Sequence, residues 1–271
     1  MKALFFDLDG TLLDSRKKIP LSAREALRAV RSKGVKVYLA SARSPRLGET
    51  LGWTEEEFSL FDGGIYSNGG YIEAAGQARY ALIDPQVVTE CVATVQACRG
   101  VHLSLHSPGH GYTFNFPVTE SLKKSWGITE ENLRPLNSAT MAQTAKILVF
   151  WRELVGATEL LPEALCRQIQ QLCAGRARHY LTDRGAAMQI TSLQAGKLTA
   201  IRSIQQQMGW SDEEIAVFGD DLNDVDMLSS YPHSIAMGNG APEAKAAAAH
   251  VTCSCDQNGV AHAIQYILHL I

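Results

Sequence analysis

The sequence predicts an α/β protein with a doubly wound parallel sheet, into which a second unit of the α+β type is inserted. Two observations predict the sheet: short apolar runs alternate with amphipathic helical segments near both ends of the chain, and several of these runs end at polar clusters. A third observation predicts the insertion. In the middle of the chain, alternating apolar residues flank a Ser-Pro-Gly-His-Gly turn, which is typical of an antiparallel hairpin.

The first elements form one βαβ unit. Residues 3–6 are an apolar run that ends at an acidic cluster, as expected for a buried parallel strand. Ser22 and Glu25 have the spacing of a capping box, and the apolar face that follows predicts a helix over 22–33. Residues 35–40 are the next strand. We therefore expect a parallel pair with a right-handed crossover.

The C-terminal part repeats this alternation. We expect helices over 197–208, 223–229, 242–249 and 259–269, and strands over 215–218, over 234–237 and near 251. Pro242 stands in the first turn of its helix, where the missing N–H would have no intrahelical partner. Both ends of the chain thus predict one Rossmann-like sheet.

The middle of the chain predicts a separate unit. It has expected helices over 86–98 and 160–174, a hairpin around 103–116, and strands over 147–151, 178–182 and 187–191. A βαβ step needs only roughly 30 residues, so roughly 100 of the residues between Arg43 and Lys197 are surplus to the sheet. We expect core segments over 1–81 and 188–271 and an inserted α+β unit over 82–187.

Composition excludes several classes of partner. The 271 residues are 46% hydrophobic and 20% charged, which supports a packed core. A net charge of −3 gives no electrostatic reason to expect nucleic acid or an anionic membrane as partner, and no apolar run approaches the roughly 18 residues of a membrane span. The start lacks a secretory signal, and six cysteines suit a reducing compartment, so we expect a cytoplasmic protein.

Two acidic clusters follow predicted strands. The first holds Asp7 and Asp9, and the second holds Asp220, Asp221, Asn223 and Asp224. In an open α/β sheet, ligand sites lie beyond the carboxyl ends of the strands. Crowded carboxylates repel each other and lose solvent there, and a divalent cation would offset both effects. Taken singly, each cluster also fits a solvated turn or a helix N-cap.

Two further motifs lie at a strand end and a helix start. Ser41, Ala42 and Arg43 follow the second predicted strand, where a hydroxyl and backbone N–H groups suit a phosphate; a plain helix cap is the alternative. Lys197 opens a helix directly after Gly196, and alone it is typical of an ordinary surface lysine. Only the order of all four motifs, each beside an element of one sheet, makes them informative.

With the four motifs in this order, the chain resembles the haloacid dehalogenase-like (HAD) phosphohydrolases, and among them the Cof-type (class IIB) sugar phosphatases. The stretches Asn68-Gly69 and Met237-Gly238-Asn239 are also similar to segments of that group. The resemblance covers both core segments, and residues 82–187 match its C2B-type cap in size and position. It implies a Mg²⁺-dependent phosphomonoesterase for small phosphorylated metabolites such as sugar phosphates, present as a monomer or weak homodimer.

The resemblance also implies a role for each motif residue. Asp7 would be the nucleophile that becomes an aspartyl-phosphate, and Asp9 the general acid and base. Mg²⁺ would be held by Asp7, the backbone carbonyl of Asp9, and Asp220. The phosphoryl group or the rest of the substrate would be bound by Ser41, Ala42, Arg43, Lys197 and Asn223, with Arg43 anchoring the substrate or the cap. Asp221 and Asp224 would be supporting residues.

Two alternative functions stay open from the sequence. A sugar phosphomutase of the same superfamily would pass the phosphoryl group from Asp7 to a sugar hydroxyl. A non-catalytic regulator would bind a phosphorylated metabolite and keep the fold. Asp9 argues against the regulator, since a binding module gains little from it, and against a dehalogenase, which has no use for a second acid.

Two sets of potential metal ligands also have alternative interpretations. His102, His106 and His110 are spaced by four, and the local pattern predicts the first two on one strand face and the third in a turn. A zinc site, packing within the insertion and substrate contact are the three interpretations. Cys253 and Cys255 form a close pair that could bind a metal ion, but no second Cys/His pair stands near them in the sequence.

Overall fold

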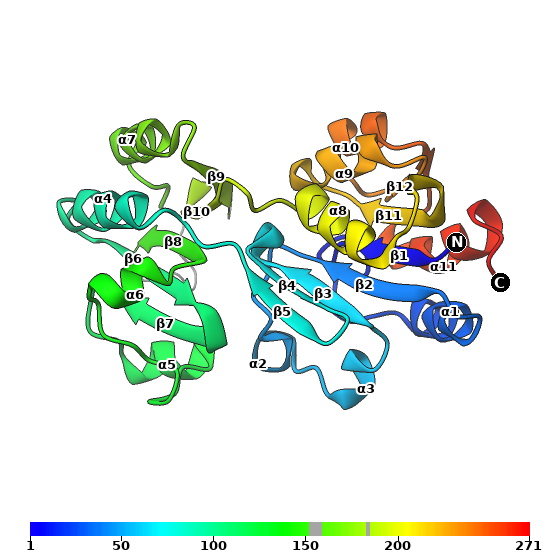
Figure 1. Cartoon of the computed structure of the whole chain (residues 1–271), viewed down its shortest axis with the longest axis horizontal. Coiled ribbons are helices and arrows are strands. Elements are labelled where there is room, and N and C mark those ends of the chain that lie inside the picture. Colours follow the sequence, from blue (N-terminus) through cyan, green and yellow to red (C-terminus); the bar gives the residue numbers. More distant parts are fainter. Residues whose placement is uncertain (152–158, 183–184) are drawn as a thin grey trace. The chain divides into compact units, whose positions relative to one another are not determined.

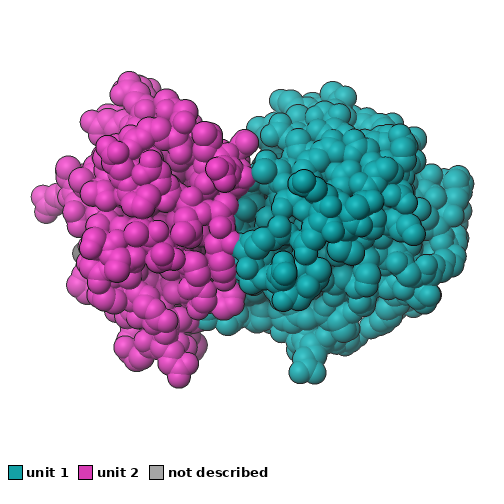
Figure 2. Space-filling model, viewed as in Figure 1, with its two compact units in different colours: residues 1–79, 196–271 teal, residues 80–195 magenta. Residues whose placement is uncertain are grey.

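The computed structural model describes residues 1–151, 159–182 and 185–271, which form two compact units (Figures 1 and 2). Unit 1 comprises Met1–Arg79 and Gly196–Ile271, and unit 2 comprises Tyr80–Ala195. The sequence placed these boundaries after residues 81 and 187. The second one lies further along the chain because β10 (Ala187–Ser192) pairs with strands of unit 2 on both its edges.

Unit 1 is built on an eight-stranded sheet in the order β13-β12-β11-β1-β2-β3-β4-β5. The strands are β1 (Ala3–Phe6), β2 (Lys36–Ala40), β3 (Gly63–Tyr66), β4 (Tyr71–Ala74), β5 (Gln77–Tyr80), β11 (Ile215–Gly219), β12 (His233–Ala236) and β13 (His250–Val251). Pairing is parallel from β13 to β3, and β4 is antiparallel to β3. This confirms the predicted parallel core; the strands β3, β4 and β5 were not predicted.

Helices cover both faces of this sheet, as in a doubly wound fold (Figure 1). The helices of unit 1 are α1 (Leu21–Ser32), α2 (Leu47–Leu51), α3 (Glu55–Phe58), α8 (Lys197–Met208), α9 (Val225–Ser230), α10 (Pro242–Ala247) and α11 (Gly259–His262). Apolar residues of α8, α9 and α10 share one core cluster with Phe5 and Val217. Phe6 and Phe218 follow Phe5 and Val217 along β1 and β11, so they point to the opposite face of the sheet, where their rings stack on each other.

Two details of the helices differ from the prediction. Ser22 and Glu25 form no capping box: α1 begins after Pro20, and the Ser22 hydroxyl donates to Asn258 Oδ1 at 2.6 Å instead. The expected final helix over 259–269 is α11 followed by a π-helical segment, Ala263–Ile267. None of the helices in the described part of the chain combines the length and apolar character that a membrane crossing requires.

Unit 2 contains a five-stranded antiparallel sheet in the order β7-β6-β8-β10-β9. Its other elements are β6 (Val101–Ser107), β7 (Gly111–Phe114), β8 (Lys146–Trp151), β9 (Ala177–Thr182), α4 (Pro85–Gln96), α5 (Glu120–Trp126), α6 (Ser138–Ala142) and α7 (Glu163–Cys173). Apolar residues of α4 and α7 pack on one face of this sheet, and three cysteines lie in that cluster. The helices and antiparallel strands confirm the predicted α+β character.

The other face of the unit 2 sheet carries aromatic residues. Phe114 and Phe150 belong to this cluster, and the ring of Trp126 lies 5.5 Å from that of Phe150. The strand register pairs His102 with Phe150 and His106 with Lys146, so both histidines lie on this face.

Candidate active site

Four loops of unit 1 leave the sheet at the same edge. Strands β11, β1, β2 and β3 are neighbours and run parallel, so their carboxyl ends lie side by side. The residues just beyond these ends include Asp220, Asp7, Ser41 and Asn68. Segments that are distant in sequence therefore meet at one edge, which is where ligands bind in sheets of this kind.

Three carboxylates gather at this edge. Asp7, Asp220 and Asp224 each offer an oxygen atom, and these oxygens lie within 4.8 Å of one another. Asp7 and Asp224 are buried, and Asp220 is partly buried. The sequence assigned Asp224 only a supporting role. Its carboxylate nevertheless lies within the same distance as those of Asp7 and Asp220, the two predicted metal ligands. The side chain of Asp9 is not part of this group.

Lys197 is buried between two of these carboxylates. Its Nζ donates to Asp7 Oδ1 at 2.5 Å and to Asp224 Oδ1 at 2.6 Å. Gly69 allows this approach: its φ is +91°, and a Cβ there would lie 2.6 Å from the backbone N of Gly196, just before α8. Lys197 is therefore an internal residue of the site and not a surface lysine.

Burial and charge shift the pKa values of this group. Burial, reinforced by Asp224 and Asp220, outweighs Lys197 and raises the pKa of Asp7 well above its ordinary value. Burial raises the pKa of Asp220 to about 6, although a hydrogen bond from Thr11 opposes this. Lys197 is buried too, but Asp224 and Asp7 raise its pKa. Three carboxylates thus face one ammonium, a donor set that fits a hard divalent cation.

The loops hold Asp220 and Asp224 in place. The Thr11 hydroxyl donates to Asp220 Oδ1 at 2.9 Å. Gly10 is required beside it, because a Cβ there would lie 2.2 Å from Asp220 Oδ2. Asp224 Oδ2 accepts the backbone N–H groups of Asp220 and Asp221, at 3.0 and 3.2 Å. Asp221 itself is exposed, and its carboxylate accepts the N–H of the next residue as an N-cap.

The predicted phosphate turn lies beside the acidic loop. Ser41 is buried, and its hydroxyl oxygen accepts the Arg43 N–H at 3.0 Å, with Ala42 between them. The Ser41 carbonyl accepts the N–H of Asn68, whose Oδ1 accepts from Asn223 Nδ2 at 3.1 Å. Asn68 therefore connects the hydroxyl turn to the acidic loop. Its φ of +54° is a conformation that asparagine adopts more readily than most residues.

Two cations hold the carboxylate of Asp9. Arg43 donates through Nε to Oδ2 at 2.5 Å and through Nη2 to Oδ1 at 2.8 Å. Lys17 Nζ donates to Oδ1 at 2.7 Å. Burial raises the pKa of Asp9, but the hydrogen bonds from Arg43 and Lys17 outweigh it and hold the pKa below its ordinary value. Lys17 had no sequence signal, since it stands in a run of three basic residues.

Asn239 explains another of the sequence stretches. Its Nδ2 donates to the Gly10 carbonyl at 2.7 Å, and its Oδ1 accepts the N–H of Cys255 at 2.8 Å. The Met237-Gly238-Asn239 stretch therefore braces the loop after β1. The sequence singled out this stretch and Asn68-Gly69, but assigned neither of them a role.

Comparison with known proteins agrees with this arrangement. The family model of haloacid dehalogenase-like hydrolases matches residues 4–264. The chain belongs to the haloacid dehalogenase-like hydrolases. This confirms the resemblance drawn from the four motifs.

Several relatives of this hydrolase are named as phosphatases. The phosphatase YwpJ of Bacillus subtilis (strain 168) is 25% identical, and the match covers 99% of this chain and 100% of the relative. The 5-amino-6-(5-phospho-D-ribitylamino)uracil phosphatase YwtE of the same bacterium is also 25% identical, with 99% and 98% covered. A solved HAD subclass IIB sugar phosphatase, BT4131, has a TM-score of 0.76 at 25% identity, with both chains fully covered. The protein is therefore a phosphatase.

The three histidines spaced by four belong to unit 2, whereas the acidic group belongs to unit 1. The His102 ring is 4.2 Å from that of Phe116, and His106 Nε2 is 3.0 Å from the Ser104 hydroxyl. His110 lies in the turn between β6 and β7, as predicted. Among the described residues, only the three aspartates form a group of three or more His, Cys, Asp or Glu side chains suited to a metal ion.

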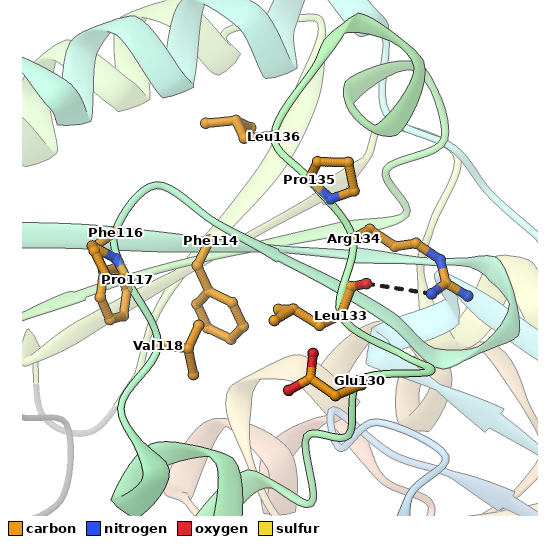
Figure 3. A pocket seen from close by; sticks show the side chains of 9 residues that line it. All are labelled: Phe114, Phe116, Pro117, Val118, Glu130, Leu133, Arg134, Pro135 and Leu136. Carbon is orange, nitrogen blue, oxygen red and sulfur yellow. Dashed lines mark hydrogen bonds between the residues drawn. The ribbon is translucent and has the colours of Figure 1, made fainter.

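Unit 2 of the hydrolase also contains a pocket of about 360 Å³ (Figure 3). It is lined by Phe114, Phe116, Pro117, Val118, Glu130, Leu133, Arg134, Pro135 and Leu136. The Arg134 guanidinium points away from the hollow and donates to the Leu133 carbonyl at 3.4 Å (Figure 3). Glu130 forms an ion pair with Lys123 Nζ at 2.8 Å, and most of the other lining residues are apolar.

Proposed function

We propose that this phosphatase hydrolyses phosphate monoesters of small metabolites, sugar phosphates among them, through an aspartyl-phosphate on Asp7. The observation that carries the proposal is the buried contact of Lys197 with Asp7 and Asp224, beside Asp220 at the carboxyl edge of the sheet. A carboxylate nucleophile next to a fixed ammonium suits phosphoryl transfer, which requires mainly positioning and neutralisation of charge.

Mg²⁺ is the proposed cofactor. Asp7, Asp220 and the backbone carbonyl of Asp9 would hold it, since hard oxygen ligands are those that Mg²⁺ prefers. The bound ion would supply neutralisation of the phosphoryl oxygens. Asp224 is better suited to positioning than to ligation, because one of its oxygens accepts from Lys197 and the other from two backbone N–H groups.

The protein groups account for both halves of the reaction. Asp7 attacks phosphorus, and the bond to the leaving oxygen breaks as Asp9 supplies that oxygen with a proton. Because Arg43 and Lys17 keep Asp9 ionised in the free enzyme, Asp9 must take up this proton from solvent once the substrate weakens these contacts. Water then attacks the phosphorus of the aspartyl-phosphate and gives its proton to Asp9, which releases phosphate and restores Asp7. Lys197 fixes the orientation of the Asp7 carboxylate throughout.

The phosphoryl oxygens need hydrogen-bond donors at the same edge of the sheet. We assign this role to the Ser41 hydroxyl, the Ala42 N–H and the Asn223 amide, with Arg43 beside them. Such preorganised donors stabilise the charge that develops in the transition state. The contacts through Asn68 support this assignment, because they fix the turn and the acidic loop relative to each other.

The proposal also covers the compartment and the oligomeric state of the enzyme. All six cysteines are free thiols, as expected in a reducing cytoplasm. The proposed assembly is a monomer or a weak homodimer, and sedimentation at micromolar concentration would test it.

Asp7→Asn tests the nucleophile. We expect release of phosphate from p-nitrophenyl phosphate with Mg²⁺ to fall by at least about 1,000-fold, because an amide cannot form the acyl phosphate. Asp226→Asn, at an exposed position of α9, is the matched control and should retain activity. Full activity of Asp7→Asn would show that Asp7 is not the nucleophile. Transfer of phosphate to an added sugar instead of water would identify a phosphomutase, and tight binding without turnover a regulator.

A further inference from the structure

We propose that Asn68 is a positioning residue of the phosphoryl site: its side-chain oxygen sets the orientation of the Asn223 amide. In this orientation the donor edge of Asn223, and not its oxygen, lies on the side of the phosphate turn at Ser41. The inference rests on the proposed function, in which Asn223 donates to the phosphoryl group. It adds a residue that acts on the reaction through Asn223 and not through contact with the substrate.

The orientation of the Asn223 side chain depends on Asn68. Asn223 Nδ2 donates to Asn68 Oδ1 at 3.1 Å. Among the residues that the structure describes, no other group forms a hydrogen bond with this amide, and Asn223 is only partly buried. No other polar contact therefore sets the rotation of the Asn223 amide.

Asn68 is itself held at the phosphate turn. It is buried, and its N–H donates to the Ser41 carbonyl at 3.0 Å. The N–H of the preceding residue, Ser67, donates to the Arg43 carbonyl at 2.8 Å. These two backbone bonds attach residues 67 and 68 to the turn, and the Asn68 side chain extends from there to the acidic loop. The Nδ2 atom of Asn223 therefore lies on the side that faces the turn.

The orientation of this amide matters because its two edges have opposite properties. Nδ2 of Asn223 donates two hydrogen bonds, whereas Oδ1 only accepts. Phosphoryl oxygens are negatively charged acceptors, so an amide rotated by 180° would place a repelling oxygen where a donor is needed. Asn68 occupies one N–H of Nδ2 and leaves the other for the phosphoryl group. A donor that is already oriented stabilises the charge of the transition state without reorganisation.

The backbone at Asn68 provides a matched control. Ser67 and Asn68 both have left-handed conformations, with φ of +51° and +54°, and both are buried. Glycine adopts this conformation without strain, so either residue can be changed to glycine with the turn retained. Of these two residues, only Asn68 has a side-chain hydrogen bond to the acidic loop. Asn68→Gly and Ser67→Gly therefore differ in the contact that is tested.

Steady-state kinetics with p-nitrophenyl phosphate and Mg²⁺ test the proposal. For Asn68→Gly we expect kcat per folded molecule to fall about tenfold, because Asn223 then presents its donor edge only part of the time. KM should stay within about twofold, since this donor acts mainly on the transition state. Ser67→Gly should keep kcat within about twofold of the wild-type value. Urea denaturation gives the folded fraction of each variant.

A double-variant cycle separates positioning from a general structural role. Asn223→Ala should lower kcat by about 100-fold, as expected for the loss of one oriented donor. Adding Asn68→Gly to Asn223→Ala should change kcat by less than about twofold, because no amide is left to orient. If Asn68 only supported the fold of the turn, Asn68→Gly would lower kcat by the same factor in both backgrounds.

The outcomes distinguish this proposal from the proposed function. The positioning role is overturned if Asn68→Gly keeps the wild-type kcat, if Ser67→Gly loses as much activity, or if Asn68→Gly has the same effect with and without the Asn223 amide. Each of these results leaves the phosphatase intact. Full activity of Asn223→Ala would overturn the phosphoryl role of Asn223 and the positioning role with it. Absence of phosphate release by the wild type, with Mg²⁺ present, overturns the proposed function itself.

Discussion

The two units bury polar groups in opposite ways. In unit 1, Lys197, Asp7 and Asp224 are buried in direct contact. In unit 2, two apolar clusters lie on either side of the sheet, and His102 and His106 pack against aromatic rings. His102 and His106 are only partly buried, but Lys146 of unit 2 is buried, so both units bury side chains that titrate. The site is distinguished by several charged side chains that meet at one place, and not merely by the burial of polar residues.

This difference has an energetic consequence. Removing one member of a buried ion pair leaves the other charge without a partner, which typically costs about 3–5 kcal/mol. Removing part of an apolar core side chain costs a comparable amount through the cavity that it leaves. The two units therefore tolerate substitutions equally poorly, but only in unit 1 should a substitution also remove catalysis.

The largest effect is expected for Lys197→Met. Activity should fall by about 1,000-fold, since the positive charge beside Asp7 is lost, and the free energy of unfolding should fall by about 3 kcal/mol. Phosphate release and urea denaturation measure the two effects. Adding Asp224→Asn removes one unpaired charge, so the double variant should regain stability without regaining activity. If the double variant is as unstable as the single one, charge burial is not the cause.

In unit 2, Ile169→Ala should lower stability by about 2–5 kcal/mol, because Ile169 is fully buried between α7 and the sheet. The rate per folded molecule with p-nitrophenyl phosphate should stay within about twofold, since the acidic group lies in unit 1. Gln168→Ala, on the exposed side of α7, is the control and should change stability by less than about 0.5 kcal/mol. A tenfold loss of rate in Ile169→Ala would contradict the expectation that the core of unit 2 affects stability but not catalysis.

Two glycines of unit 1 allow a finer test. Gly69 and Gly76 both have positive φ, but a Cβ on Gly69 would overlap the Gly196 backbone, whereas a Cβ on Gly76 meets nothing within 4 Å. Both alanine variants should lose about 1–2 kcal/mol of stability through the left-handed conformation. Only Gly69→Ala should also lose about 100-fold in activity, because it displaces the start of α8 and Lys197. Equal rates for the two variants would show that the close packing of Gly69 against Gly196 is not needed for activity.

The smallest effect concerns a charge with a structural role. Hydrogen bonds from Thr54, first its backbone N–H and then its hydroxyl, lower the pKa of Glu57 from 4.5 to about 2, with a further contribution from Arg24. A carboxyl whose pKa is lower in the folded state stabilises the fold above its unfolded pKa, and loses this contribution as pH falls through the folded value. The stability difference between wild type and Glu57→Gln should therefore be about 1 kcal/mol at pH 7 and shrink between pH 4.5 and 2.

Urea denaturation at pH 7 and pH 3.5 measures this difference, with Glu55→Gln, at an exposed neighbouring position, as the control. Phosphatase activity at pH 7 should be unaffected in both variants. A difference that is the same at both pH values would contradict the assignment.

The sequence predicted the parts of unit 1 that follow from strand order. Asp7 and Asp220 follow apolar runs, and the ends of parallel strands share one edge, so their meeting was predictable. Strands β3, β4 and β5 were not, because glycine or polar residues interrupt them and they form no continuous apolar run like that of β1. Strand pairing in unit 2 beyond the hairpin likewise depends on contacts between segments far apart in the chain.

Site residues were missed where backbone conformation decides their role. Thr11, Asn68 and Lys17 reach the site through loops, and two of them have positive φ. No spacing rule distinguishes Lys17 from Arg16 and Lys18; only the turn closed by Asp14 does so. For such residues the identity of the side chain is visible in the sequence, but its direction is not.

The position of β1 in the sheet bears on how the enzyme is made. This strand lies between β2, which follows soon after it, and β11, which is synthesised only after all of unit 2. During translation β1, which precedes Asp7, therefore has one edge unpaired until β11 is made, and an unpaired edge is prone to association with other chains. A chain that ends before residue 215 would have neither Asp220 nor a complete sheet, and its aggregation would show how much the nascent polypeptide depends on its last fifth.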